Sequence, residues 1–149
     1  MKAITIHQPW ATLIALGEKR FETRGWKTNY RGPIAIHASK QLLYDYRLPK
    51  LSGRLWELGL RKEEDFPLGC VIAIADLVEC WPVRAHIGKE VHLFFPRSGR
   101  SRFLDKEGTE VAFGDFTPGR YAWELANVQC IEPVPVKGQQ GLWNWEGNV

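Results

Sequence analysis

Lys19, Glu22 and Arg24 are three charged residues that lie close together near the beginning of the chain. Alternate side chains of a strand share a face, so a strand through this tract aims Glu22 and Arg24 the same way, with Lys19 just before it. Arginine binds phosphate or a base edge through paired hydrogen bonds, a carboxylate accepts from an exocyclic amine, and lysine neutralises phosphate. The set suits a nucleotide-sized ligand. The alternative is a surface ion-pair cluster worth about 0–1 kcal/mol.

Aromatic residues are interleaved with these charges at Trp10, Trp26 and Tyr30, and Arg31 follows the last of them. A flat ring beside a cation is what an unpaired base requires, and stacking contributes about 1–3 kcal/mol per base. We therefore expect the charged residues and at least one of Trp26 or Tyr30 to line a single cleft. Because the chain contains seven tryptophans, core packing is the alternative, and Trp10 fits either use.

His37 and Ser39 share one face of a later predicted strand, where an acid/base role is open to them. The alternative for His37 is a buried ring that satisfies neighbouring polar groups. The sequence contains neither a G-x-S-x-G turn nor a P-loop, so no serine-hydrolase elbow and no phosphate-binding loop is expected.

Positive charge is concentrated at the N-terminal end of a chain whose net charge is only +3. Residues 1–40 contain seven Lys or Arg and two Glu, whereas the remaining residues contain thirteen basic and fifteen acidic groups. An anionic partner is expected to bind at that end, although a solvated basic surface explains the charge alone equally well. A second basic cluster lies in a loop that either follows a phosphate backbone or forms a solvated tip: Arg97, Arg100, Arg102 and Lys106.

The three cysteines, Cys70, Cys80 and Cys130, are widely spaced and form no C-x-x-C motif. They share no ligand spacing with the histidines, so neither a metal nor a cofactor is expected. An odd number of cysteines suits a reducing compartment, and we expect a cytoplasmic protein. The N-terminus lacks the apolar stretch of a secretory signal, and no segment is long and apolar enough to span a bilayer, so no membrane association is expected.

The elements that must position the charged residues follow from local patterns. Ile4–His7 alternates as a strand, and the spacing from Pro9 to Gly17 predicts a helix of about two turns. Arg20–Trp26 and Ile34–Ala38 are predicted strands separated by the turn residues Thr28–Pro33, and we expect them to pair as a hairpin.

The rest of the chain predicts mainly short strands. Residues 40–62 indicate two helices broken near Pro49, and residues 70–81 form an apolar run typical of a central strand. Residues 91–95 predict a strand, 96–108 a polar loop within a long hairpin, and 119–131 another strand with an irregularity at Asn127, ended by Pro133 and Pro135. The length suits one domain, 1–149, of mixed but mainly β structure built as a barrel.

Several motifs resemble the ASCH domain family over nearly the whole chain. They are Ile6-His7-Gln8-Pro9-Trp10-Ala11, Gly17-x-Lys19-x-x-Glu22-x-Arg24-x-Trp26, Tyr30-Arg31-Gly32, Gly69-Cys70-Val71, Asp76-Leu77-Val78-Glu79-Cys80 and Pro133-Val134-Pro135-Val136-Lys137-Gly138 with Trp143. The resemblance implies a PUA-like β-barrel with short flanking helices and a role with RNA or DNA. The first hypothesis is therefore a domain that binds RNA, single-stranded DNA or a modified nucleotide in a basic cleft beside the first helix and hairpin.

The resemblance leaves enzyme activity open, because some small members resemble amidohydrolases that deacetylate acetylated cytidine and others are ribonucleases. The deacetylating members carry Lys-x-x-Thr, whereas Glu22 stands at the corresponding position here and Thr23 comes one residue later. In a strand that shift aims the Thr23 hydroxyl at the opposite face. A small hydrolase remains the alternative, with Lys19 and Glu22 as catalytic residues and Glu22 as a general base acting on water.

Overall fold

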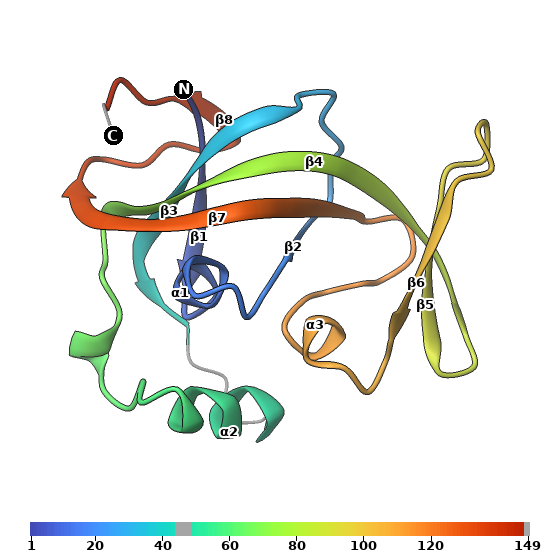
Figure 1. Ribbon diagram of the computed structural model, residues 1–149, viewed down its shortest axis with the longest axis horizontal. Coiled ribbons are helices and arrows are strands. Elements are labelled where there is room, and N and C mark those ends of the chain that lie inside the picture. Colours follow the sequence, from blue (N-terminus) through green and yellow to red (C-terminus); the bar gives the residue numbers. More distant parts are fainter. Residues whose placement is uncertain (44–48, 148–149) are drawn as a thin grey trace.

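The computed structural model describes residues 1–43 and 49–147, with residues 49 and 50 described by backbone alone (Figure 1). Its strands are β1 (Lys2–Gln8), β2 (Phe21–Arg24), β3 (Gly32–Leu42), β4 (Cys70–Ile87), β5 (Glu90–Phe94), β6 (Ser101–Asp105), β7 (Tyr121–Pro135) and β8 (Leu142–Asn144). Its helices are α1 (Trp10–Ala15), α2 (Pro49–Glu57), the 3-10 turn η1 (Glu63–Asp65) and α3 (Thr109–Ala112).

The strands form one curled sheet, which confirms the mainly β, barrel-like fold class. The strand order is β2-β7-β4-β3-β1-β8, with β5 pairing β4 and β6 pairing β5. β1 and β3 are parallel, and the other pairs are antiparallel. Among the described strands no ladder joins β2 to β1 or β8, so the barrel stays open along one side, which we call the seam.

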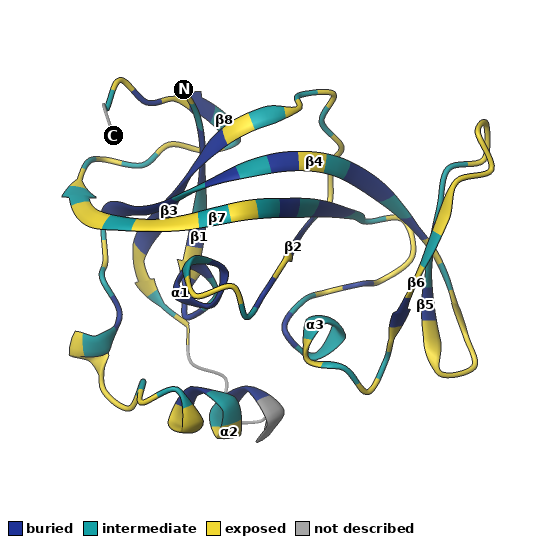
Figure 2. Cartoon of the chain, viewed as in Figure 1, coloured by how far each residue is buried: buried dark blue, intermediate teal, exposed yellow. Residues whose placement is uncertain are grey.

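The core lies inside the curl, where α1 packs against the sheet. α1 contacts β1, β3, β4 and β7, and its residues 11–14 are all buried. In β3 the residues from Ile34 to Ser39 are buried, because this strand is central and covered on both faces (Figure 2). The helix ends as the sequence predicted, since Gly17 adopts a φ of 78° that favours glycine.

The predicted hairpin between Arg20–Trp26 and Ile34–Ala38 is wrong. β2 pairs with β7, with Glu22 opposite Trp123, whereas β3 pairs with β1 and β4. The chain between β2 and β3 runs from residue 25 to residue 31, which is longer than a tight hairpin turn and lets the two strands take different neighbours. The Trp123 indole N–H holds this tract in place by donating to the Trp26 carbonyl at 3.3 Å.

Residues 40–62 also depart from the two predicted helices. β3 continues to Leu42, residues 44–48 lie outside the described part, and one α-helix begins at Pro49, where a first helical turn tolerates proline. The same segment contains η1, and Leu51, Leu55 and Phe66 pack beneath Leu13 of α1. The helical spacing of apolar residues was therefore misleading at residues 40–42, because these residues extend the central strand β3.

Two other strands run further than predicted. The predicted strand at 70–81 continues to Ile87, and β7 passes through Pro133 to Pro135, where Pro135 lies opposite Cys70. A register shift between Val71 and Ala73 interrupts the ladder near Pro133, and irregular pairing is where a strand accommodates proline. The irregularity predicted at Asn127 is confirmed by its φ of 52°.

The long hairpin expected around the strand at 91–95 and the loop at 96–108 is confirmed as β5 and β6, although β6 lies inside the predicted polar loop. The hairpin stands at the end of the molecule away from α1 and α2 (Figure 1). α3 and β8 were not predicted, because each is short and has no repeating apolar pattern. None of the described helices is long and apolar enough to cross a membrane.

Candidate nucleic-acid interface

Lys19 is buried where the chain passes from α1 to β2. Its side chain is 1% exposed, and its ammonium donates a hydrogen bond to the Phe21 carbonyl. Burial lowers the pKa of Lys19, and the carboxylates of Glu22 and Glu110 oppose that shift. Lys19 is therefore an interior ammonium that is poised to lose its proton more readily than a surface lysine.

Glu22 and Arg24 face the interior of the barrel, on the face of β2 that packs beside Trp123. One Glu22 carboxylate oxygen accepts from the Thr23 backbone N–H at 3.0 Å, and the other lies 3.4 Å from Arg24 Nη2. The same Arg24 nitrogen donates to the Thr5 carbonyl at 2.7 Å. The structure thus brings Lys19, Glu22 and Arg24 together inside the seam, not on the outer wall.

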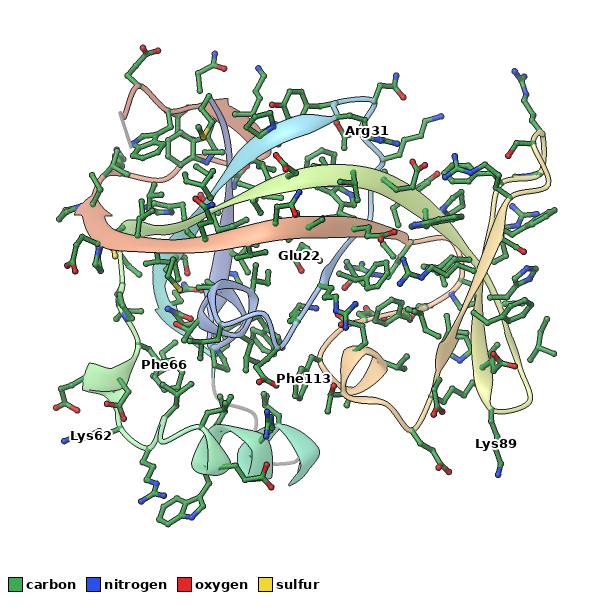
Figure 3. All side chains as sticks on the ribbon, in the orientation of Figure 1. Glu22, Arg31, Lys62, Phe66, Lys89 and Phe113 are labelled. Carbon is green, nitrogen blue, oxygen red and sulfur yellow. The ribbon has the colours of Figure 1, made fainter. Side chains whose placement is uncertain are left out.

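A cavity of about 280 Å³ opens beside this group, lined by Trp10, Glu22, Thr23, Ala112, Phe113, Gly114 and Asp115. Figure 3 labels two of these residues, Glu22 and Phe113. The ammonium of Lys19 lies just behind the wall, because a Cβ built on Gly114 would be 3.3 Å from it. The Thr23 hydroxyl accepts from the Asp115 N–H at 3.1 Å and is thereby held at this wall. Sequence analysis missed residues 112–115, whose loop reaches the cavity only through long-range folding.

Trp26 and Tyr30 do not line that cavity. Trp26 is 39% exposed and meets Trp123 edge-on with ring centroids 4.8 Å apart. The Tyr30 hydroxyl donates to the Pro33 carbonyl. Because β2 and β3 are not a hairpin, the tract that carries both rings leads away from Glu22 toward β4.

A second concavity, of about 550 Å³, lies between that tract, β4, the start of β7 and the tip of the β5–β6 hairpin. We call it the basic groove, because five cations line it: Lys27, Arg31, Arg84, Arg97 and Arg100. Its apolar lining includes Phe95, Pro96 and Tyr121. Figure 3 shows Arg31 on the side of the molecule toward which the hairpin tip rises, with Lys89 at the opposite end of the hairpin.

Glu79 forms ion pairs with two of these cations, Arg31 and Arg100. It lies 2.6 Å from Arg31 and 2.8 Å from Arg100. Burial opposes ionisation of Glu79, but hydrogen bonds from the Cys80 N–H, Arg31 and Arg100 together hold its pKa below the usual range. Within the described part of the chain, no carboxylate lies within ion-pair distance of Lys27, Arg84 or Arg97, so these three cations keep their charge available.

His37 and Ser39 line a third cavity, of about 360 Å³, on the other side of β3. His37 is 2% exposed, and its Nε2 lies 2.8 Å from the Val136 carbonyl. Burial lowers the pKa of His37, while the hydrogen bond to Val136 opposes the shift. The Ser39 hydroxyl lies 2.8 Å from His7 Nδ1. The structure therefore separates this pair from both Glu22 and the basic groove.

Most of the residues that sequence analysis singled out are thus divided among three concavities, whereas Trp26 and Tyr30 line none of them. Lys19, Glu22, Arg24 and Trp10 gather at the seam, Arg31 lies in the basic groove, and His37 and Ser39 lie beside β3. Lys27 and Arg84 were missed, since neither belongs to a motif. Among the described residues, no group of three or more His, Cys, Asp or Glu side chains is placed to hold a metal ion.

The sequence matches the family profile described as the ASCH domain over residues 4–135, a range that includes β2, β4, β7 and both walls of the basic groove. The chain belongs to the ASCH domain family. ASCH domains have a PUA-like fold, and the family is associated with RNA binding.

This ASCH domain is similar to the human and mouse proteins named activating signal cointegrator 1. Each is 36% identical to it over 86 residues, which is 52% of this chain and 14% of the relative. The match therefore covers a small part of each relative's length.

Proposed function

We propose that this ASCH domain binds single-stranded RNA or DNA, with the sugar-phosphate backbone in the basic groove. The observation that supports this best is the presence of five cations around one concavity, three of them without a carboxylate partner in the described structure. A strand of phosphates is the ligand that matches a row of such charges, because each cation that binds it releases condensed counterions.

The lining of the groove suits single strands more than a regular duplex. Phe95 and Tyr121 place rings among the cations, and the Arg100 guanidinium lies 5.2 Å from the Trp81 ring centroid. Unpaired bases stack on such rings without regard to sequence. The groove thus takes the place of the basic cleft that sequence analysis expected, and it lies at the 27–31 tract and the β5–β6 tip, away from the first helix.

The test is a fluorescence titration of a labelled oligonucleotide at several salt concentrations. Arg84→Ala and Arg97→Ala should each weaken binding and reduce the slope of log K against log salt by about 0.7, the value for one phosphate contact on a single strand. Lys89→Ala and Lys62→Ala are matched controls, because both lysines are exposed and neither lines the groove (Figure 3). Affinity that is insensitive to salt, or equally sensitive to the controls, would contradict the proposal.

A second candidate function is hydrolysis of a modified nucleoside, such as acetylated cytidine, or of RNA. It is favoured by the Glu22 carboxylate in the wall of the 280 Å³ cavity, beside Trp10 and in front of the buried Lys19. The Trp10 ring would stack on a base, and Glu22 would remove a proton from the attacking water. The size is near the lower end for ligand pockets, about 300–1,000 Å³, and suits one base.

Release of cytidine from acetylated cytidine, and cleavage of RNA, test this second function. Glu22→Gln keeps the shape of the side chain but removes its basicity, so turnover should fall by about 100-fold or more. Undiminished turnover in Glu22→Gln would exclude the general-base role. Saturable binding of the modified nucleoside without turnover would instead make the cavity a modified-nucleotide pocket.

A further inference from the structure

The outward face of the β5–β6 hairpin carries three aromatic rings: His92, Phe94 and Phe103. The opposite face of the hairpin packs Val91, Leu93 and Leu104 into the core against Trp81 and Phe116. Since side chains alternate along a strand, the three rings point away from that core. We call these rings the ring ladder.

The ring ladder is a continuous stack. His92 and Phe103 are directly opposite each other across the two strands, with ring centroids 4.6 Å apart and planes inclined by 6°. His92 also stacks on Phe94, with centroids 5.2 Å apart and an inclination of 29°. Phe103 is a terminal ring of this stack and is 48% exposed, so one of its faces is open to solvent.

The ring ladder is continuous with the basic groove. Phe94 immediately precedes Phe95, Pro96 and Arg97, which line the groove. On β4, the exposed Arg84 lies in a register shift next to Ala85, and Ala85 is the residue opposite His92. The acidic pair of this hairpin, Glu90 opposite Asp105, lies at the other end, by the turn that contains Lys89.

We propose that the ring ladder is a stacking platform for the bases of a single-stranded nucleic acid whose phosphates lie in the basic groove. The inference rests on the proposed function and adds a second contact surface to it. A base stacked on the open face of Phe103 would continue a stack that the protein has already ordered. The unpaired cations at the groove end of the ladder are complementary to a nucleic-acid strand, whereas a protein strand added to β6 would leave them without a partner.

The platform predicts a dependence on bases that comes from Phe103, in addition to any stacking on Phe95 and Tyr121 in the groove. Phe103→Ala should weaken binding of an oligoadenylate by about five- to 150-fold, the range for loss of one stacked base. The same substitution should leave binding of an abasic oligomer of equal length unchanged, because that oligomer keeps the phosphates and lacks the rings. The slope of log K against log salt should also be unchanged, since no cation is removed.

Two further variants control this experiment. Phe103→Leu keeps an apolar side chain and removes the ring, so it should also weaken oligoadenylate binding, and thermal unfolding of both variants checks that the fold is retained. Trp56→Ala removes an exposed ring on α2, far from the groove, and should have no effect.

Each outcome bears on one proposal. If Phe103→Ala leaves oligoadenylate affinity intact, or weakens the abasic oligomer equally, the platform is overturned while the groove can still stand. If Arg84→Ala and Arg97→Ala leave the salt slope intact, the proposed function itself is lost. A change of oligomeric state in Phe103→Ala, measured by sedimentation, with unchanged nucleic-acid affinity would make this face a contact between copies of the chain and overturn the platform.

Discussion

The guanidinium of Arg24 donates a 2.7 Å hydrogen bond to the backbone carbonyl of Thr5 and so ties β2 to β1 across the seam. Between these two described strands no backbone ladder exists, and Glu22, 3.4 Å from the same guanidinium, completes the link. The Arg24 side chain thus links β2 to β1, two described strands that no backbone ladder joins.

Removing this link should destabilise the domain. A hydrogen bond that involves a charged group contributes about 1.5–3 kcal/mol, and the Arg24 side chain is half-buried. We expect Arg24→Ala to lower the free energy of unfolding in urea by this amount. Arg20→Ala changes an exposed neighbour and should stay within about 0.5 kcal/mol of the natural protein. Equal stability of the two variants would show that Arg24 does not close the seam.

Close packing beside β3 leaves no room for a side chain at Gly138. A Cβ at this position would lie 2.6 Å from His37 Cε1 and 2.8 Å from Thr5 Oγ1. Gly138→Ala should therefore cost about 1–3 kcal/mol of stability through overpacking. Gly53→Ala, at an exposed position of α2 with no atom near the added Cβ, should instead stabilise by about 0.5–1 kcal/mol. Chemical denaturation of both variants measures these opposite signs.

The buried Lys19 should make stability depend on pH in the alkaline range. Burial lowers its pKa in the folded state, so between that pKa and about 10.4 the unfolded chain binds more protons than the folded one. The free energy of unfolding, taken relative to Lys19→Met, should therefore rise with pH in this window and be flat below it. A difference between the two proteins that stays constant up to pH 10 would contradict the lowered pKa.

Glu110 of α3 protects the outer edge of β2. Its carboxylate accepts from the backbone N–H of Arg20 at 3.0 Å and of Phe21 at 2.9 Å. Glu110→Ala leaves these donors without their partner and should lower the free energy of unfolding by about 1 kcal/mol. Hydrogen exchange at the Phe21 amide gives a local measure, because that amide should exchange faster in the variant while amides of β4 change less.

Local sequence patterns were sufficient to predict the elements whose own residues show a clear helical or strand pattern. α1 followed from Pro9, the apolar spacing and Gly17, and β4 followed from a long β-branched run. The predicted strand pairing was wrong. Whether β2 pairs with β3 or with β7 depends on the burial of Trp123 and on the length of the 25–31 tract. No short-range pattern contains that information.

The candidate sites show the same difference between groups that are close in the sequence and groups that only the fold brings together. The Lys19, Glu22 and Arg24 group was predicted because three nearby positions suffice to bring it together. The basic groove takes Lys27 and Arg31 from one tract, Arg84 from β4, and Arg97 and Arg100 from the hairpin tip. These tracts meet only in the folded sheet, so the groove could not be read from spacing.

The barrel is easiest to deform along the open seam, because no backbone ladder joins the described strands there. Parting β3 from β4 would break a row of backbone hydrogen bonds, whereas spreading β1 from β2 requires the loss of the Arg24 contact and a change of its rotamer. Glu22, the ion-pair partner of Arg24, lines the cavity at this line. A widening of the barrel beside this cavity would therefore need only a side-chain rearrangement, and every strand pairing would be kept.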